Sequence, residues 1–209
     1  LLLLHMDEAS GLTLMDSSGR GQDFTLDSGG SLGQAGAFGT GMVGSADGTI
    51  GGLVGTRVFT YQAWVKAPVG SPYYSYLLHM AGSGLWFYLG SGSFNVGIPF
   101  TSGTRSLVAA IPPGDGSYHH VAIVMDADRP YRNILLLWDG QVVAGSQWQI
   151  PPDGVRLTTA GANFQAYSGT SMDEVHLEAR ARYDFPIGPA RQKALGRKTR
   201  FNLWEGARR

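Results

Sequence analysis

Short apolar runs that alternate with polar residues, each closed by turn-forming residues, constrain the fold of this chain more than any other feature. The clearest run covers residues 59–66 and would place apolar and polar side chains on opposite faces of one strand. One face would carry Phe59, Tyr61, Ala63 and Val65, and the other Thr60, Gln62, Trp64 and Lys66. The pattern predicts a β-strand whose apolar face lies in a core.

Similar runs follow along the chain, each bounded by Gly, Pro, Asp or Ser. The pair Asp139-Gly140 separates two of them and indicates a hairpin, because glycine tolerates the positive φ of a type I′ turn. A helical pattern occurs only at residues 189–195. We therefore predict an all-β, two-sheet antiparallel sandwich. The further runs are Tyr76–Met80, Leu85–Leu89, Ser106–Ile111, His119–Asp126, Asn133–Trp138 and Gln141–Ala144.

Glycine is concentrated in residues 28–56, where the pattern leaves open a long loop, an interrupted edge strand or a subunit-contact arm. The chain has no cysteine, which excludes a disulfide framework and a thiolate metal site. No stretch approaches the roughly 18 apolar residues that a membrane span needs. The apolar opening at residues 1–4 is too short for a signal peptide. We expect neither a targeting segment nor membrane insertion.

Four stretches carry recognisable motifs in a fixed order. They are LLLHMDEASG with DSSGRG in residues 2–21, FTYQAWVK at 59–66, YHHVAIVMD with LLWDGQVV in 118–143, and SMDEVH at 171–176. Together they resemble the laminin-G-like domains of the concanavalin A-like jelly-roll class over about residues 2–185. The resemblance implies a two-sheet jelly roll.

The opening LLLHMD and the closing ARARYDFP are similar to copies found in tailed-bacteriophage virion proteins. The glycine-rich stretch and the basic extension at the C-terminal end depart from the family pattern. We expect one jelly-roll domain over residues 1–187, in which residues 28–56 form a glycine-rich loop or arm. A short basic C-terminal arm would follow over residues 188–209.

No group of residues predicts catalysis, so we expect a protein that is not an enzyme. Glycosidases with this jelly roll carry a Glu-x-Asp-x-x-Glu pattern, which is missing from this sequence. Glu174, His176 and Glu178 would share one strand face, but Glu174 and Glu178 would lie about 13 Å apart. Even inverting glycosidases place their carboxyl groups only about 6.5–9.5 Å apart.

No metal site or other cofactor is predicted. His119 and His120 are adjacent, so on a strand they point to opposite faces. The resemblance makes them structural, hydrogen-bonded at a strand entrance. Asp16 and Asp173 occupy positions where relatives sometimes hold calcium, but two carboxylates fall short of the roughly six oxygens that calcium takes. We expect Asp16 to cap a turn and Asp173 to make a buried hydrogen bond; the alternative is a structural calcium ion.

Aromatic side chains are the candidates for carbohydrate binding, because lectins stack sugar rings on exposed aromatics. Trp64 falls on the polar face of its strand, and Trp86 and Tyr88 share a face opposite apolar neighbours. Tyr73 and Tyr74 lie in a Pro/Gly-rich loop. For each ring the alternative is packing in the core.

Charge is divided unevenly along the chain. Residues 1–179 contain seven basic and 14 acidic residues, a formal charge of −7, whereas residues 180–209 contain nine basic and two acidic ones, a charge of +7. A basic arm with apolar anchors suits docking on an acidic partner; the alternatives are a lid on its own domain and nucleic-acid binding, which the acidic body disfavours. The docking candidates are Arg191, Lys193, Arg197, Lys198, Arg200, Phe201, Leu203 and Trp204.

These observations favour a structural or adhesive protein of a tailed-phage virion, either a capsid decoration subunit or a tail-fibre or tail-tip module. Its partners would be other virion proteins and copies of itself in a homo-oligomer. The alternative is a lectin-like module, extracellular or on a cell surface, that recognises a surface glycan. We expect no nucleic acid as a partner.

Overall fold

The computed structural model describes residues 1–167 and 169–185, which form fifteen β-strands and no helix. These described residues contain no helix that is long and apolar enough to cross a membrane. The strands are β1 (Leu2–Leu4), β2 (Thr13–Leu14), β3 (Phe24–Leu26), β4 (Ser31–Ala35), β5 (Thr40–Thr49), β6 (Val58–Lys66), β7 (Ser75–Met80), β8 (Leu85–Gly90), β9 (Ser93–Phe100), β10 (Gly103–Ala110), β11 (Tyr118–Asp126), β12 (Ile134–Trp138), β13 (Gln141–Ser146), β14 (Gly161–Ala166) and β15 (Ser171–Glu178).

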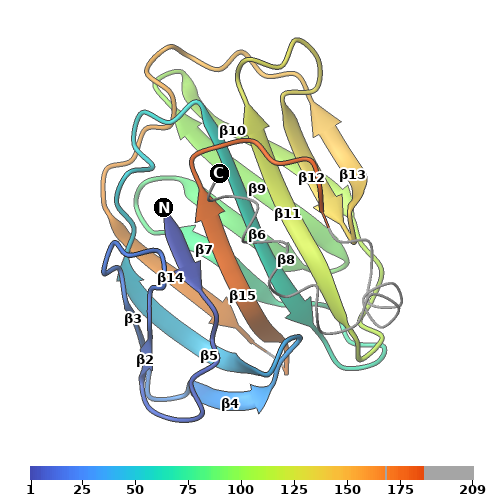
Figure 1. Ribbon diagram of the computed structural model, residues 1–209. Helices are drawn as coiled ribbons and strands as arrows, with labels where there is room; N and C mark the ends of the chain where they lie inside the picture. Colours follow the sequence, from blue (N-terminus) through green and yellow to red (C-terminus); the bar gives the residue numbers. More distant parts are fainter. Residues whose placement is uncertain (168, 186–209) are drawn as a thin grey trace.

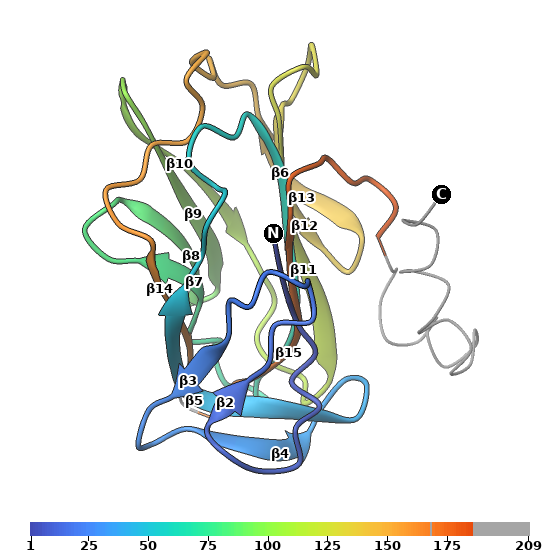
Figure 2. The same cartoon turned by 60° about the vertical axis from the view of Figure 1, so that its left-hand side comes forward.

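The strands form two facing layers with antiparallel pairing throughout (Figure 1). We call the layer with the order β1-β15-β6-β11-β12-β13 sheet A. Sheet B has the order β2-β3-β5-β14-β7-β8-β9-β10. Figure 2 shows sheet B on the left and sheet A on the right, with β4 and β5 beneath them. The predicted all-β, two-sheet sandwich is confirmed.

The glycine-rich stretch at residues 28–56 is built mainly of β4 and β5, so most of it is sheet rather than loop. The second half of β5 pairs with β14 in sheet B, while Met42 in its first half pairs with Met172 of β15 in sheet A. One strand therefore joins the two layers at this end of the sandwich. Glycine is required at Gly44, because a Cβ there would lie 2.4 Å from the Cα of Gly30.

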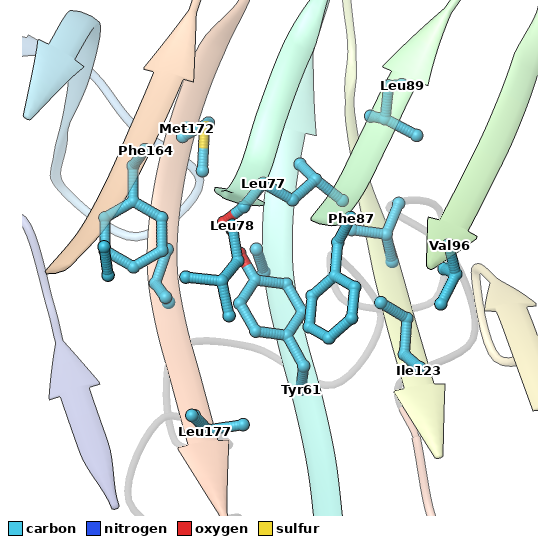
Figure 3. Packing of buried hydrophobic residues seen from close by; sticks show 14 of the residues in the cluster. Tyr61, Leu77, Leu78, Phe87, Leu89, Val96, Ile123, Phe164, Met172 and Leu177 are labelled. Atoms are coloured by element: carbon cyan, nitrogen blue, oxygen red, sulfur yellow. The ribbon is translucent and has the colours of Figure 1, made fainter. Parts of the chain in front are cut away.

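The core lies between the layers and is filled by aromatic and aliphatic side chains (Figure 3). Phe59 and Tyr61 of β6 approach the ring of Phe87 on β8, with ring centroids 6.1 and 5.2 Å apart. The apolar face predicted for residues 59–66 is fully buried, which confirms its orientation. Burying such rings stabilises a sandwich through the apolar area removed from water.

The opposite face of β6 is also buried, contrary to the expected polar surface. Thr60 is 0% and Gln62 7% exposed. Residues 179–185, which follow β15, cross in front of β6 and β11 and cover them (Figure 1). The Thr60 hydroxyl donates to the carbonyl of Arg180 (2.8 Å) and accepts from the amide of Arg182 (2.9 Å).

A second, smaller apolar cluster lies beneath this crossing segment. Ala181 and Phe185 pack against four buried side chains of β11 and β12. Much of the outer face of sheet A is therefore occupied by the chain itself. The helix predicted at residues 189–195 and the basic arm lie outside the described residues. The four buried side chains are Ala122, Val124, Leu135 and Leu137.

Candidate functional site

Four half-buried rings gather on the outer face of sheet B, and we call this group the ring face. It consists of Tyr76 and His79 on β7 and Trp86 and Tyr88 on β8. Strand alternation on β8 turns Leu85, Phe87 and Leu89 into the core and its two aromatic neighbours outward. The same alternation that builds the core thus presents the rings.

A β-bulge in β7 is needed to bring Tyr76 and His79 to the same face. Residues three apart on a regular strand point to opposite faces. The pairing of β7 with β8 shifts between Tyr76 and Leu78, and Leu77 and Leu78 are both fully buried. The extra residue restores the outward direction of His79.

The rings contact one another across and along the strands. The Tyr76 ring stacks on His79 with centroids 4.7 Å apart and an interplanar angle of 26°. It also approaches Tyr88 at 4.8 Å, tilted by 41°. These contacts restrict the rotation of the Tyr76, His79 and Tyr88 side chains. A ligand would therefore bind rings that are already held in place.

Two glycines let the β8 rings lie close to the sheet. A Cβ on Gly97 of β9 would come within 2.3 Å of indole Cε2 of Trp86, and one on Gly90 within 2.2 Å of the hydroxyl oxygen of Tyr88. Real Cβ atoms do not approach so closely. The indole and the phenol thus lie over bare backbone, each with one side toward the sheet.

Polar side chains border the rings in two rows that run across the strands. One row follows Asp47, Asn163, His79, Trp86, Gly97 and Ser106, and the other Ser45, Gln165, Tyr76, Tyr88, Asn95 and Val108. The border therefore supplies carboxamides and hydroxyls at both ends of the aromatic group.

Some of these polar groups are engaged and others are open. The Asn163 amide donates to Asp47 Oδ1 (2.7 Å), and the Asn95 amide donates to Ser93 Oγ (2.8 Å). Within residues 1–167 and 169–185, the carboxamide of Gln165 has no hydrogen-bond partner. Burial raises the pKa of Tyr88, with smaller contributions from Tyr76 and Tyr74. Its phenol therefore stays protonated and able to donate at neutral pH.

The other aromatic candidates from the sequence lie elsewhere. Trp64 is 4% exposed and packs edge-on against Phe38 and His120. Tyr73 is 1% exposed and meets Trp138. The expected exposure is wrong for both, because distant segments close over them. Tyr74 is half-buried beside the ring face, with its hydroxyl 3.5 Å from Ser91 Oγ.

The two adjacent histidines are held by hydrogen bonds at the start of β11, as predicted. His119 contacts Asp139 Oδ2 through Nδ1 (2.6 Å) and Asp115 Oδ1 through Nε2 (3.1 Å). His120 lies on the other face, where its Nε2 contacts Gln62 Oε1 at 3.0 Å. Burial lowers the pKa of His120 to about 3, so this ring is neutral.

The carboxylates singled out in the sequence are likewise engaged. Asp16 accepts from the amides of Ser18 (2.9 Å) and Gln22 (3.0 Å), which caps the turn. Asp173 is fully buried and accepts from the amide of Phe38 at 3.0 Å. Burial raises the pKa of Asp173 to about 8. In the described part of the chain, no three His, Asp or Glu side chains form a group suited to a metal ion.

Glu174, His176 and Glu178 lie on sheet A, on the opposite layer from the ring face. His5 Nδ1 lies 2.9 Å from Glu174 Oε2, and Gln62 Nε2 lies 3.1 Å from His176 Nδ1. Glu178 is paired with Arg180. These contacts connect β15 to its neighbours and to the crossing segment.

Comparison with known families agrees with this architecture. A family model described as the concanavalin A-like lectin/glucanases superfamily matches residues 39–184. The chain belongs to this superfamily. The laminin-G-like resemblance of the sequence is thereby confirmed. The comparison with curated protein sequences gave no match.

Solved structures show the superfamily fold in binding domains of botulinum neurotoxins. The serotype D/C VPI 5993 binding domain is similar with a TM-score of 0.62 and 13% identity, over 85% of this chain and 50% of that one. The botulinum neurotoxin DC binding domain solved in complex with SialylT has a TM-score of 0.62 and 13% sequence identity. The match covers 85% of this chain and 49% of that one. This chain thus spans about half the length of either structure. At such low identity the likeness shows the fold.

The sequence predicted half of the ring face. Trp86 and Tyr88 follow from simple alternation, whereas Tyr76 and His79 were missed because regular alternation separates them. The adjacent pair Leu77-Leu78 is the signal that could have found them. Two neighbouring large apolar residues in an otherwise alternating strand indicate a bulge that buries both.

Proposed function

We propose that this protein is a non-enzymatic binding module that recognises carbohydrate through the ring face of sheet B. The observation that carries the proposal is the group of four outward rings, two of them laid over glycines. Sugars have apolar C–H faces that pack against aromatic rings, and their hydroxyls need polar partners nearby.

The surroundings of the rings supply those polar partners. Gln165 and Asn95 lie in the same cross-strand row as Tyr76 and Tyr88, on either side of them. A sugar stacked on the rings would thus meet carboxamides at its edges. Such groups fix orientation and specificity in ligand sites.

The layer that carries the rings also favours this assignment. The outer face of sheet A is crossed by residues 179–185, with Phe185 packed on its apolar cluster. The rings lie on the other layer, where they are half-buried rather than covered. The outer face of sheet B therefore offers a group of four aromatic side chains to a ligand.

Substitution of the indole tests the proposal. The full chain and Trp86→Ala would be applied to a glycan array, and the best-bound oligosaccharide would then be titrated by calorimetry. We expect the substitution to abolish or strongly weaken binding while the melting temperature stays close to wild type. Tyr131→Ala is the matched control, because Tyr131 is 65% exposed and lies between β11 and β12.

Two results would overturn the proposal. A wild-type chain that binds no glycan, or one whose binding survives both Trp86→Ala and Tyr88→Ala, would remove the ring face as a sugar site. Loss of folding in Trp86→Ala would assign the indole to packing, and Tyr88→Ala would then serve as the deciding variant.

A second candidate role is assembly into a tailed-phage virion, as a decoration or tail module. The charge division between residues 1–179 and 180–209 favours it, since a basic segment and an acidic body of another copy attract each other. Removal of residues 189–209 should then abolish association with particles while the domain stays folded. Unchanged association would contradict this role.

A further inference from the structure

We infer that the ring face selects neutral oligosaccharides, extended across the strands of sheet B, over glycans that carry sialic acid, uronic acid or sulfate. This inference rests on the proposed carbohydrate-binding function and concerns the class of sugar that the same surface takes. It follows from which charges border the rings and from the direction in which the rings are aligned.

No Lys or Arg side chain lies among the outward residues of the strands that form this face. The cross-strand pairing assigns the outward positions of β5, β14, β7, β8, β9 and β10, and neither Lys nor Arg occurs at any of them. Arg105 of β10 pairs with core-facing Ile98, so it belongs to the other side of its strand. The row that contains Trp86 begins at the carboxylate of Asp47.

An anionic sugar would therefore lose water without gaining a counter-charge. Removing a charge from water is costly unless the charge is paired and hydrogen-bonded. Asp47, which is held by the Asn163 amide at 2.7 Å, would repel a sugar carboxylate or sulfate at that end of the row. Neutral hydroxyls need only the donors and acceptors that Gln165, Asn95 and Tyr88 provide.

The alignment of the rings points to an oligosaccharide rather than a single sugar. The row that holds Tyr76 and Tyr88 begins at Gln165 on β14 and reaches Asn95 on β9. These are four neighbouring strands, which cover about 14 Å across the sheet at the usual strand spacing. Several sugar units laid across the strands would use the whole row.

Matched glycan pairs test the inference. An array would carry β-linked gluco- and galacto-oligosaccharides and α-linked manno-oligosaccharides of two to six units. Each would be printed beside a counterpart with sialic acid, uronic acid or sulfate, and the chain would be applied at low and high salt. We expect at least tenfold tighter binding to the neutral member of each bound pair, and tighter binding to longer chains.

A variant with an added cation gives an independent readout. Ser106 is exposed on β10 in the row of Trp86 and Gly97. Ser106→Arg should raise the affinity for the anionic member of each bound pair several-fold relative to the neutral member. Thr101→Arg, at an exposed position in the turn before β10, is the control for the added charge itself.

The possible outcomes distinguish failure of the neutral selectivity from failure of the proposed carbohydrate binding. Equal or tighter binding of the anionic members, lost in Trp86→Ala, would overturn the neutral selectivity and leave the ring face as a sugar site. Tight binding of single sugars without gain from longer chains would overturn the extended mode. Absence of any Trp86-dependent binding across the array would overturn the proposed function and this inference with it.

Discussion

The indole of Trp86 on β8 lies over Gly97 on β9, where a Cβ would come within 2.3 Å of indole Cε2. The two residues are paired across the strands, so the indole packs flat on the backbone of a residue that has no side chain. The orientation of the indole therefore depends on the absence of a side chain at this position of the neighbouring strand.

Gly97→Ala should lift the indole from the sheet and weaken glycan binding about tenfold, or about 1.4 kcal/mol. The added methyl meets three indole atoms at 2.3–2.7 Å, so the ring must move. Gly29→Ala is the control, because nothing lies within 4 Å of a Cβ at that position. Calorimetric titration measures the glycan affinity of both variants. Wild-type affinity in Gly97→Ala would show that Gly97 does not position the indole.

Tyr76→Ala should also weaken binding, although Tyr76 contributes mainly by holding other rings. Its ring contacts both His79 and Tyr88, and its removal leaves both less restricted. We expect a loss of roughly three- to tenfold, near 1 kcal/mol, as for a supporting aromatic contact. Tyr76→Phe keeps the ring and should bind like wild type. If both substitutions weaken binding equally, the phenol hydroxyl rather than the stacking is responsible.

Stability should fall on acidification because of the buried His120. Burial lowers its folded-state pKa to about 3, whereas an unfolded histidine titrates near 6.5. Between these values the unfolded chain binds the extra proton, so this group removes about 1.4 kcal/mol of unfolding free energy per pH unit of acidification. The stabilising contribution is complete above about pH 6.5.

Urea unfolding of wild type and His120→Gln between pH 4.5 and 7.5 measures this effect. Glutamine can still donate to Gln62, which His120 Nε2 contacts at 3.0 Å. The wild-type free energy of unfolding should fall more steeply with acidification than that of the variant. Parallel curves would mean that His120 binds its proton equally well in the folded and the unfolded chain.

Thr60→Val should loosen the segment that crosses sheet A. The hydroxyl links the carbonyl of Arg180 to the amide of Arg182, and valine has the same shape without the polar atom. Leaving buried backbone groups unpaired costs about 1–3 kcal/mol. Thr49→Val, at an exposed position, should change stability little.

Hydrogen exchange locates the effect of Thr60→Val. Amides of residues 179–185 should exchange faster in this variant, while those of β8 and β9 keep their protection. Uniformly faster exchange across both sheets would instead mean that Thr60 supports the fold as a whole.

The alternation of apolar and polar residues predicted which side chains form the core, but it did not predict which side chains are exposed on the outer faces. In residues 59–66 it predicted correctly that Tyr61 faces inward, because every second residue of a strand shares a face. It failed for Trp64, since burial of that ring is caused by Phe38 and His120, which come from other parts of the chain. Tyr73 is similar, because its contact with Trp138 joins residues far apart in sequence.

The ring face shows the same division between local and distant causes. Trp86 and Tyr88 were found because β8 is regular. His79 was missed because its direction depends on the bulge at Leu77 and Leu78, which regular alternation does not include. Gly97 was visible in the sequence, but its position under Trp86 depends on the pairing of β8 with β9.

The crossing segment also fixes the side on which the chain leaves the described domain. Phe185 packs on the outer face of sheet A. Strands β7 and β8, which carry the rings, lie in the other layer (Figure 2). A support that held the domain from the side of Phe185 would leave the rings facing the surroundings. Copies mounted this way on one support would present their rings in the same outward direction, and weak single contacts would combine into avidity.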